Sequence, residues 1–226
     1  IIVAYSKFEN ENYIKKNIKS KKVIFFKIKK KLKNKVQDQL FKIKKSLEIS
    51  KGRIIYLLDG DDIFKKEKIE IISKTINTKE IMVLDNYFVL MNKKKFKNKS
   101  LSHKKNFLYK KLVNDWPKNV CTSAISIKRE LLLKFFKDIM INKYKYLAID
   151  ILLAIYCNNE KKLSRVNKFL TEKIELDESV DKDYIGFSNK LYWHRRLEQH
   201  RYNFFVKKKR YFNLDFFMSY ILSKLF

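Results

Sequence analysis

Three aspartates, Asp59, Asp61 and Asp62, directly follow the apolar run 54–58. Carboxylates this close together repel one another and raise each other's pKa unless a cation neutralises them. Mg²⁺ and Mn²⁺ commonly bind one or two carboxylates together with the phosphate oxygens of a substrate. The cluster therefore predicts a metal site, unless it is only a strand-to-helix turn. For Asp62 alone, a helix cap or a supporting role is predicted.

Strands and helices alternate around these aspartates. Apolar periodicity predicts strands over 1–5, 21–28, 53–58 and 80–91, and helices over 11–19, 34–50 and 65–76. This alternation favours an α/β fold with substantial parallel pairing, in which ligands bind at the carboxyl ends of the strands. The aspartates lie at such an end.

The second half of the chain is less regular. A basic, polar loop is predicted over 92–106, strand-like segments over 121–128 and 162–176, and helices over 129–139, 144–157 and 188–205. The prediction is one domain over 1–185, followed by a basic, aromatic, helical C-terminal segment over 186–226.

The overall charge is strongly positive, since 53 Lys and Arg oppose 24 Asp and Glu to give +29. Such a charge suits nucleic acid, an anionic membrane or nucleotide phosphates. The lysines are spread almost evenly, however, and no nucleic-acid-binding motif accompanies them, so a solvated surface is the simpler interpretation. No nucleic-acid partner is expected.

The apolar runs are too short to cross a membrane, and no signal peptide is recognised, so a cytoplasmic location is expected. The last segment, 211–226, is apolar and follows the basic stretch 206–210. It is expected either to pack on the domain or to lie against an anionic bilayer at the inner face of the cell membrane. Cys121 and Cys157 are expected to be reduced, structural thiols.

Three metal chemistries compete for the aspartates. A calcium loop of the EF-hand type fits poorly, because Ile63 and Phe64 stand where a ligand and a glycine are needed. A haloacid-dehalogenase-like phosphatase would use Asp59 as nucleophile and Asp61 as acid, but the later Gly-Asp motif of that family is absent from the sequence. The third chemistry is sugar transfer from a nucleotide diphosphate that a metal bridges.

The stretch "SLEISKGRIIYLLDGDDIFKKEKIE", residues 46–70, resembles the family 2 glycosyltransferases of GT-A fold. In that family a helix ends in A/S-x-G, and a strand, L-D-x-D-D and a further helix follow. The resemblance implies a GT-A-like, mixed but mostly parallel sheet flanked by helices. It also implies inverting, metal-assisted transfer, from a UDP- or GDP-sugar to a hydroxyl on a glycan or lipid-linked acceptor, as in bacterial cell-surface polysaccharide synthesis.

The resemblance also implies roles for single residues. Asp59 would contact the donor and share the metal, Mg²⁺ or Mn²⁺, with Asp61, which binds it on the diphosphate. Ser6 stands where the family's second strand ends beside the nucleotide base, and is assigned to the donor. The family's first strand is missing from this sequence, so the chain is expected to be N-terminally truncated and weakly active or inactive.

Further residues carry over from the second half of the chain. Trp116, Thr122 and Ser123 lie in the stretch "WPKNVCTSAISIKRELL", which is similar to the strand that faces the sugar and the acceptor. Asp150, isolated among apolar residues, stands where inverting members place the catalytic base. Arg195 and Arg196 are weaker candidates for the diphosphate, and a basic amphipathic helix face is the alternative.

Overall fold

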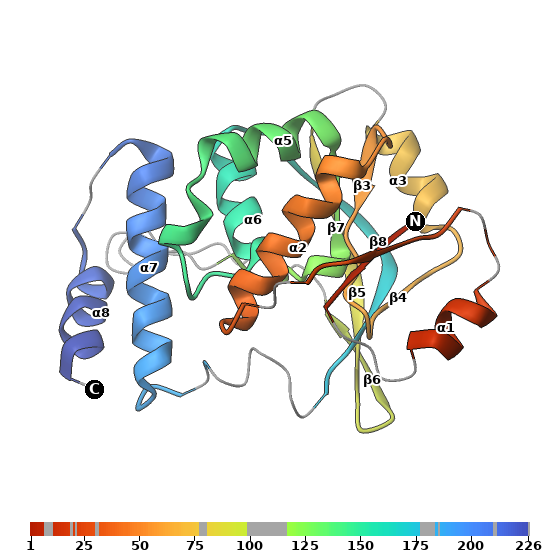
Figure 1. Cartoon of the computed structure of the whole chain (residues 1–226). Helices are drawn as coiled ribbons and strands as arrows, with labels where there is room; N and C mark the ends of the chain where they lie inside the picture. Colours follow the sequence, from red (N-terminus) through yellow and green to blue (C-terminus); the bar gives the residue numbers. More distant parts are fainter. Residues whose placement is uncertain are drawn as a thin grey trace.

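The computed structural model describes residues 1–6, 11–18, 20, 22–29, 32–76, 81–98, 117–176, 184, 186–209 and 212–225. Its strands are β1 (Ile2–Tyr5), β2 (Ile24–Lys27), β3 (Ile54–Tyr56), β4 (Ile63–Phe64), β5 (Met82–Met91), β6 (Lys94–Asn98), β7 (Ile125–Lys128) and β8 (Leu163–Ile174). Its helices are α1 (Glu11–Asn17), α2 (Lys35–Ile49), α3 (Lys68–Ile76), α5 (Arg129–Asp138), α6 (Ile149–Asn159), α7 (Lys190–Lys207) and α8 (Leu214–Leu225), with 3₁₀ turns η1 (Thr122–Ala124) and η2 (Ile141–Lys143). Figure 1 shows the arrangement.

The main sheet is mixed and mostly antiparallel. Its strand order is β3-β7-β5-β8-β4, with β6 on β5, and β5–β8 is the parallel pair among the described strands. The expected α/β class with a helical C-terminal segment is confirmed, but the mostly parallel sheet is wrong. The cause is β7, which inserts antiparallel between β3 and β5. Strands β3 and β5 do run in the same direction, as the intervening α3 suggests, but they are not neighbours.

Strands β1 and β2 form a separate, parallel two-stranded sheet. Among the described residues it shares no strand pairing with the main sheet. The single sheet that the strand-helix alternation implies is therefore divided in two.

The predicted basic loop over 92–106 begins with a hairpin. Asn92 and Lys93 have positive φ angles of 50° and 62°, the conformation of a two-residue type I′ turn. The turn brings β6 back along β5, with Lys94 opposite Met91. The loop prediction is wrong for 94–98, and 99–106 lie outside the described residues.

The core lies on both faces of the main sheet. Helices α2, α5 and α6 cover one face, and α3 covers the other (Figure 1). Strand β5 shows the alternation, since Met82 and Leu84 join the larger cluster and Val83 packs with α3. Cys121 and Cys157 are buried free thiols, as expected.

The C-terminal helices extend the α6 side of the domain. Helix α7 packs on α6, where the hydroxyl of Tyr202 donates to the carbonyl of Leu152 (3.0 Å), and α8 packs on α7 (Figure 1). None of the helices in the described ranges is long and apolar enough to cross a membrane.

Candidate functional site

The strand pairing of β3 with β7 determines what the aspartate cluster contacts. Tyr56 pairs with Ser126, and the Leu57 amide donates to the carbonyl of Ile125 at 3.1 Å. Continuing this antiparallel register places Ser123 opposite Asp59. The Asp59 amide indeed donates to the Ser123 hydroxyl at 2.9 Å. The turn after β3 is thereby joined to η1, which precedes β7.

The turn itself, residues 59–62, is closed by the Asp62 amide, which donates to the Asp59 carbonyl at 3.2 Å. Gly60 does not have a positive φ angle, and a Cβ atom added there would meet no atom within 4 Å. The fold therefore does not require glycine at this position. Its absent side chain instead leaves the backbone of the turn open to an approaching ligand.

The carboxylate of Asp59 is partly buried and hydrogen-bonded. Its Oδ1 accepts from Gln39 Nε2 on α2 at 2.8 Å, and Thr122 is a further hydrogen-bond partner. Burial raises the pKa of Asp59 to about 6, and the carboxylates of Asp62 and Asp61 raise it further, against the two hydrogen bonds. Gln39 was not predicted, and nothing in the local pattern of α2 distinguishes it.

Asp62 supports the turn from below. Its Oδ1 accepts from the Ile174 amide at the end of β8 (2.9 Å), and Ser123 is a second hydrogen-bond partner of its side chain. Helix α3 begins only at Lys68, so the helix-cap prediction for Asp62 is wrong and the supporting role is what the structure has. Burial raises the pKa of Asp62 as well.

Asp61 is the exposed carboxylate of the three. The described residues contain no group of three or more His, Cys, Asp and Glu that could hold a metal ion by themselves. Asp59 and Asp61 nevertheless fit a hard cation, because both supply oxygen ligands and because the repulsion that raises the pKa of Asp59 would be relieved by a positive charge. Mg²⁺ and Mn²⁺ readily complete such a pair with phosphate oxygens and water.

A buried ion pair lies beneath η1. Lys68 Nζ is 2.7 Å from Asp85 Oδ1, and both side chains are fully buried. Lys68 also donates to the Ser123 carbonyl at 2.6 Å and to the Thr171 hydroxyl at 2.7 Å. Burial lowers the pKa of Lys68 and raises that of Asp85, and their mutual attraction opposes both shifts.

This pair connects α3, β5 and β8 to the segment that holds Asp59. Thr171 completes the network by donating to Asp85 Oδ2 at 2.7 Å. Sequence reasoning missed the network, although a signal existed. Lys68, Ile72 and Ile76 form one helical stripe, and all three are buried, so Lys68 occupies a core position of α3.

Asp150 lies in the first turn of α6, because that helix begins at Ile149 and not at the predicted residue 144. A carboxylate is favoured there by the helix dipole, and Asp150 Oδ1 accepts from the Ile151 amide at 2.7 Å. The thiol of Cys121 links this position to the aspartate turn. After burial, the carboxylates of Asp150 and Asp62 are what raises the pKa of Cys121, so both lie close to that thiol.

The remaining predicted residues differ in how they relate to the turn. Thr122 and Ser123 are buried and contact Asp59 directly. Ser6 follows β1, and its buried hydroxyl has no hydrogen-bond partner among the described residues, as a ligand-binding group would before its ligand arrives. Trp116 lies outside the described residues.

The two arginines are not brought to the turn. Arg196 is buried between α7 and α8, where its guanidinium pairs with Asp215 and donates to Gln199 Oε1 at 2.9 Å. The guanidinium of Arg195 lies 4.6 Å from the centre of the Tyr184 ring. Helix α7 lies beyond α6 from the main sheet (Figure 1). A role for these arginines at the diphosphate remains a prediction that no contact of the structure supports.

The raised pKa of Asp59 has a consequence for stability. The pKa rises from 3.8 to about 6 on folding, so the stabilisation from proton uptake is complete below about pH 4 and is lost as the pH rises through 6. Asp59→Asn is therefore expected to increase the free energy of unfolding above pH 7 by about 1–2 kcal/mol. Urea unfolding across this pH range measures it. Glu67→Gln, at an exposed carboxylate, should leave the parent profile unchanged, and an Asp59→Asn profile identical to the parent's would contradict the expectation.

Comparison with protein-family models and with curated proteins finds no match to this chain. The function must therefore be argued from the site. In chemical terms, the site combines an exposed and a partly buried carboxylate on an open turn with hydroxyl groups beneath them, and a further carboxylate on α6 near the same thiol.

Proposed function

We propose that this chain is a metal-assisted, inverting glycosyltransferase with a GT-A-like domain. The observation that carries the proposal is the contact of Asp59 with Thr122 and Ser123. These residues come from two stretches, 46–70 and 116–132, that resemble separate parts of one family's active site. Their meeting supports the resemblance, because a chance match to either stretch would not predict it.

The aspartate turn would bind the diphosphate of a UDP- or GDP-sugar. Asp61 and Asp59 would hold Mg²⁺ or Mn²⁺, which when bound neutralises the charge that develops on the departing diphosphate. Asp59 must be ionised for this, so donor binding should weaken below about pH 6. The free hydroxyl of Ser6 is available for a further donor contact.

Asp150 would take the proton from the acceptor hydroxyl as that oxygen attacks the anomeric carbon. The position suits a base, because the carboxylate is only partly buried and the Ile151 amide orients it. Thr122 and Ser123 have a positioning role in this scheme, since their side chains hold Asp59 and Asp62. Trp116 is retained as the aromatic candidate for stacking on an acceptor sugar, which would be part of a glycan or a lipid-linked precursor.

The test is a screen of UDP- and GDP-sugars with Mn²⁺, which measures donor binding by calorimetry and transfer or hydrolysis by nucleotide release. In this assay, Asp150→Asn is expected to keep donor affinity and lose transfer by about 10²–10⁴-fold, because it removes only the base. Glu130→Gln is the matched control, since Glu130 occupies the first turn of α5 but is exposed.

Three outcomes would overturn the proposal. One is full transfer activity in Asp150→Asn. Another is release of inorganic phosphate from phosphate monoesters through a covalent aspartyl intermediate at Asp59, which would indicate the phosphatase. The last is salt-sensitive binding of nucleic acid, without nucleotide-sugar binding, that Asp59 and Asp61 substitutions leave unchanged.

A further inference from the structure

Helix α8 packs on α7 with its polar side. The fully or nearly fully buried residues of α8 are Ser219 and Ser223, four positions apart. One turn earlier on the same side, Asp215 pairs with Arg196 and lies 3.3 Å from His200 Nε2, both on α7. The contact between the two helices is thus built on an acid and two serines.

The apolar side of α8 faces outward. Leu214, Phe217, Met218, Ile221 and Leu225 follow the spacing of a single helix face, and 42–72% of each residue's surface is exposed. A helix on the surface of a water-soluble domain normally shows the reverse arrangement, with its apolar stripe against the core. An apolar stripe left in solvent on a helix that is otherwise well packed indicates a surface that binds something apolar.

The surroundings of this stripe are strongly basic. Residues 186–226 contain nine Lys and Arg and two acids, and 9 − 2 gives +7. Both acids are engaged within the protein, Asp215 with Arg196 and Glu198 with the amides of Lys145 and Tyr146. The exposed charge around α8 is therefore positive.

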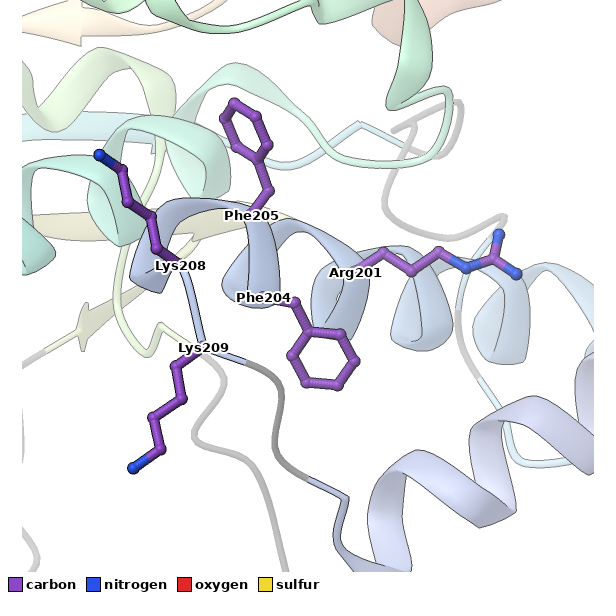
Figure 2. Close-up of a pocket in the computed structure, with 5 residues that line it drawn as sticks. All are labelled: Arg201, Phe204, Phe205, Lys208 and Lys209. Atoms are coloured by element: carbon purple, nitrogen blue, oxygen red, sulfur yellow. The ribbon is translucent and has the colours of Figure 1, made fainter.

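A basic hollow of about 440 Å³ lies at the end of α7. Its lining residues are Arg201, Phe204, Phe205, Lys208 and Lys209. Figure 2 shows the side chains of Arg201, Lys208 and Lys209 extending in different directions from α7, with the two phenylalanines between them. Cations beside aromatic rings suit a phosphate group at the boundary between water and lipid.

We propose that α8 and the end of α7 form a membrane anchor that binds the surface of an anionic bilayer. Leu214, Phe217, Met218, Ile221 and Leu225 enter the boundary between headgroups and acyl chains, and the lysines and Arg201 contact lipid phosphates. The charge favours a bilayer over a second copy of the chain, because two surfaces of the same positive sign repel each other. Since the described helices do not span a membrane, the contact is peripheral. It is independent of the chemistry at Asp59.

Co-sedimentation of the full chain with vesicles tests the anchor. Binding is expected to vesicles of equimolar phosphatidylcholine and phosphatidylglycerol, and to fall at least about tenfold with phosphatidylcholine alone, because basic residues near an anionic surface each add to the affinity. Lys208→Gln with Lys209→Gln should likewise weaken binding at least about tenfold and reduce its dependence on salt.

The apolar contribution is tested by Phe217→Ser with Ile221→Ser, which should lower the affinity for anionic vesicles at least about tenfold. Leu133→Ser with Met140→Ser removes exposed apolar residues at α5 instead, and should bind like the parent. Absence of binding to anionic vesicles would overturn the anchor, as would parent-like binding by both the serine and the glutamine pairs. Light scattering that shows a dimer which Phe217→Ser with Ile221→Ser dissociates, without vesicle binding, would assign the stripe to self-association and overturn it too.

Discussion

Asp61→Ala is expected to lower metal-dependent transfer and hydrolysis of the nucleotide-sugar donor by about 10³-fold. Asp61 is the exposed carboxylate of the turn, so a cation shared with a diphosphate reaches it without rearrangement of the protein. Because the side chain takes no part in packing, the free energy of unfolding should change by less than about 0.5 kcal/mol. Nucleotide release and Mn²⁺ titration by calorimetry measure the two functional effects.

The matched control for Asp61 is Glu67→Ala, which removes an exposed carboxylate in the same charged stretch. It should retain parent activity and Mn²⁺ affinity. If Asp61→Ala also retained both, the aspartate turn would not be the metal site, and the glycosyltransferase proposal would lose its main support.

Lys68→Met is expected to destabilise the protein by about 3–5 kcal/mol, because it leaves the carboxylate of Asp85 buried without its partner. For a chain of this size the midpoint of thermal unfolding should fall by about 10 °C. Urea unfolding at neutral pH measures the free energy. The methionine keeps most of the side-chain volume, so the loss reports the charge and its hydrogen bonds rather than a cavity.

The double variant Lys68→Met with Asp85→Leu separates the ion pair from its surroundings. Replacing a buried pair by apolar residues is often neutral, so most of the lost stability should return. Lys74→Met is the control, since Lys74 pairs with Glu70 on the exposed side of the same helix and should cost less than about 0.5 kcal/mol. A Lys68→Met variant as stable as the parent would contradict the assigned role.

The double variant also tests how the network serves the site. Without Lys68, the Ser123 carbonyl loses its ammonium donor, and Ser123 is what holds the Asp59 amide. Donor affinity should therefore remain weakened even where stability has returned. Parent-like donor affinity would restrict Lys68 to a structural role.

Local order along the chain was predicted wherever one apolar pattern dominates. The spacing of Val36, Leu40 and Leu47 defined a helix over 34–50, and the structure has α2 at 35–49 with Asn34 as its N-cap. The failures lie where a contact distant in sequence decides the conformation. Strand β6 carries mostly lysine and forms because the Asn92–Lys93 turn folds it onto β5.

The candidate site divides in the same way. Sequence alone placed three carboxylates at the end of a strand, because short apolar runs and their polar ends are local features. Neither Gln39 nor Lys68 could be assigned to the site from sequence, because each contacts it through a fold that joins distant segments. The antiparallel insertion of β7 brings Thr122 and Ser123 to Asp59, whereas parallel pairing with β3 would have placed the other end of β7 there.

The C-terminal helix shows the same limit. By itself, the sequence determined that residues 214–225 form a helix with an apolar stripe, since the helical period sets which side chains share a face. Only the tertiary structure decided which face packs inward. The inward face is polar because α7 offers Arg196 and His200 as partners for Asp215, and an ion pair between two helices depends on residues that local sequence does not bring together.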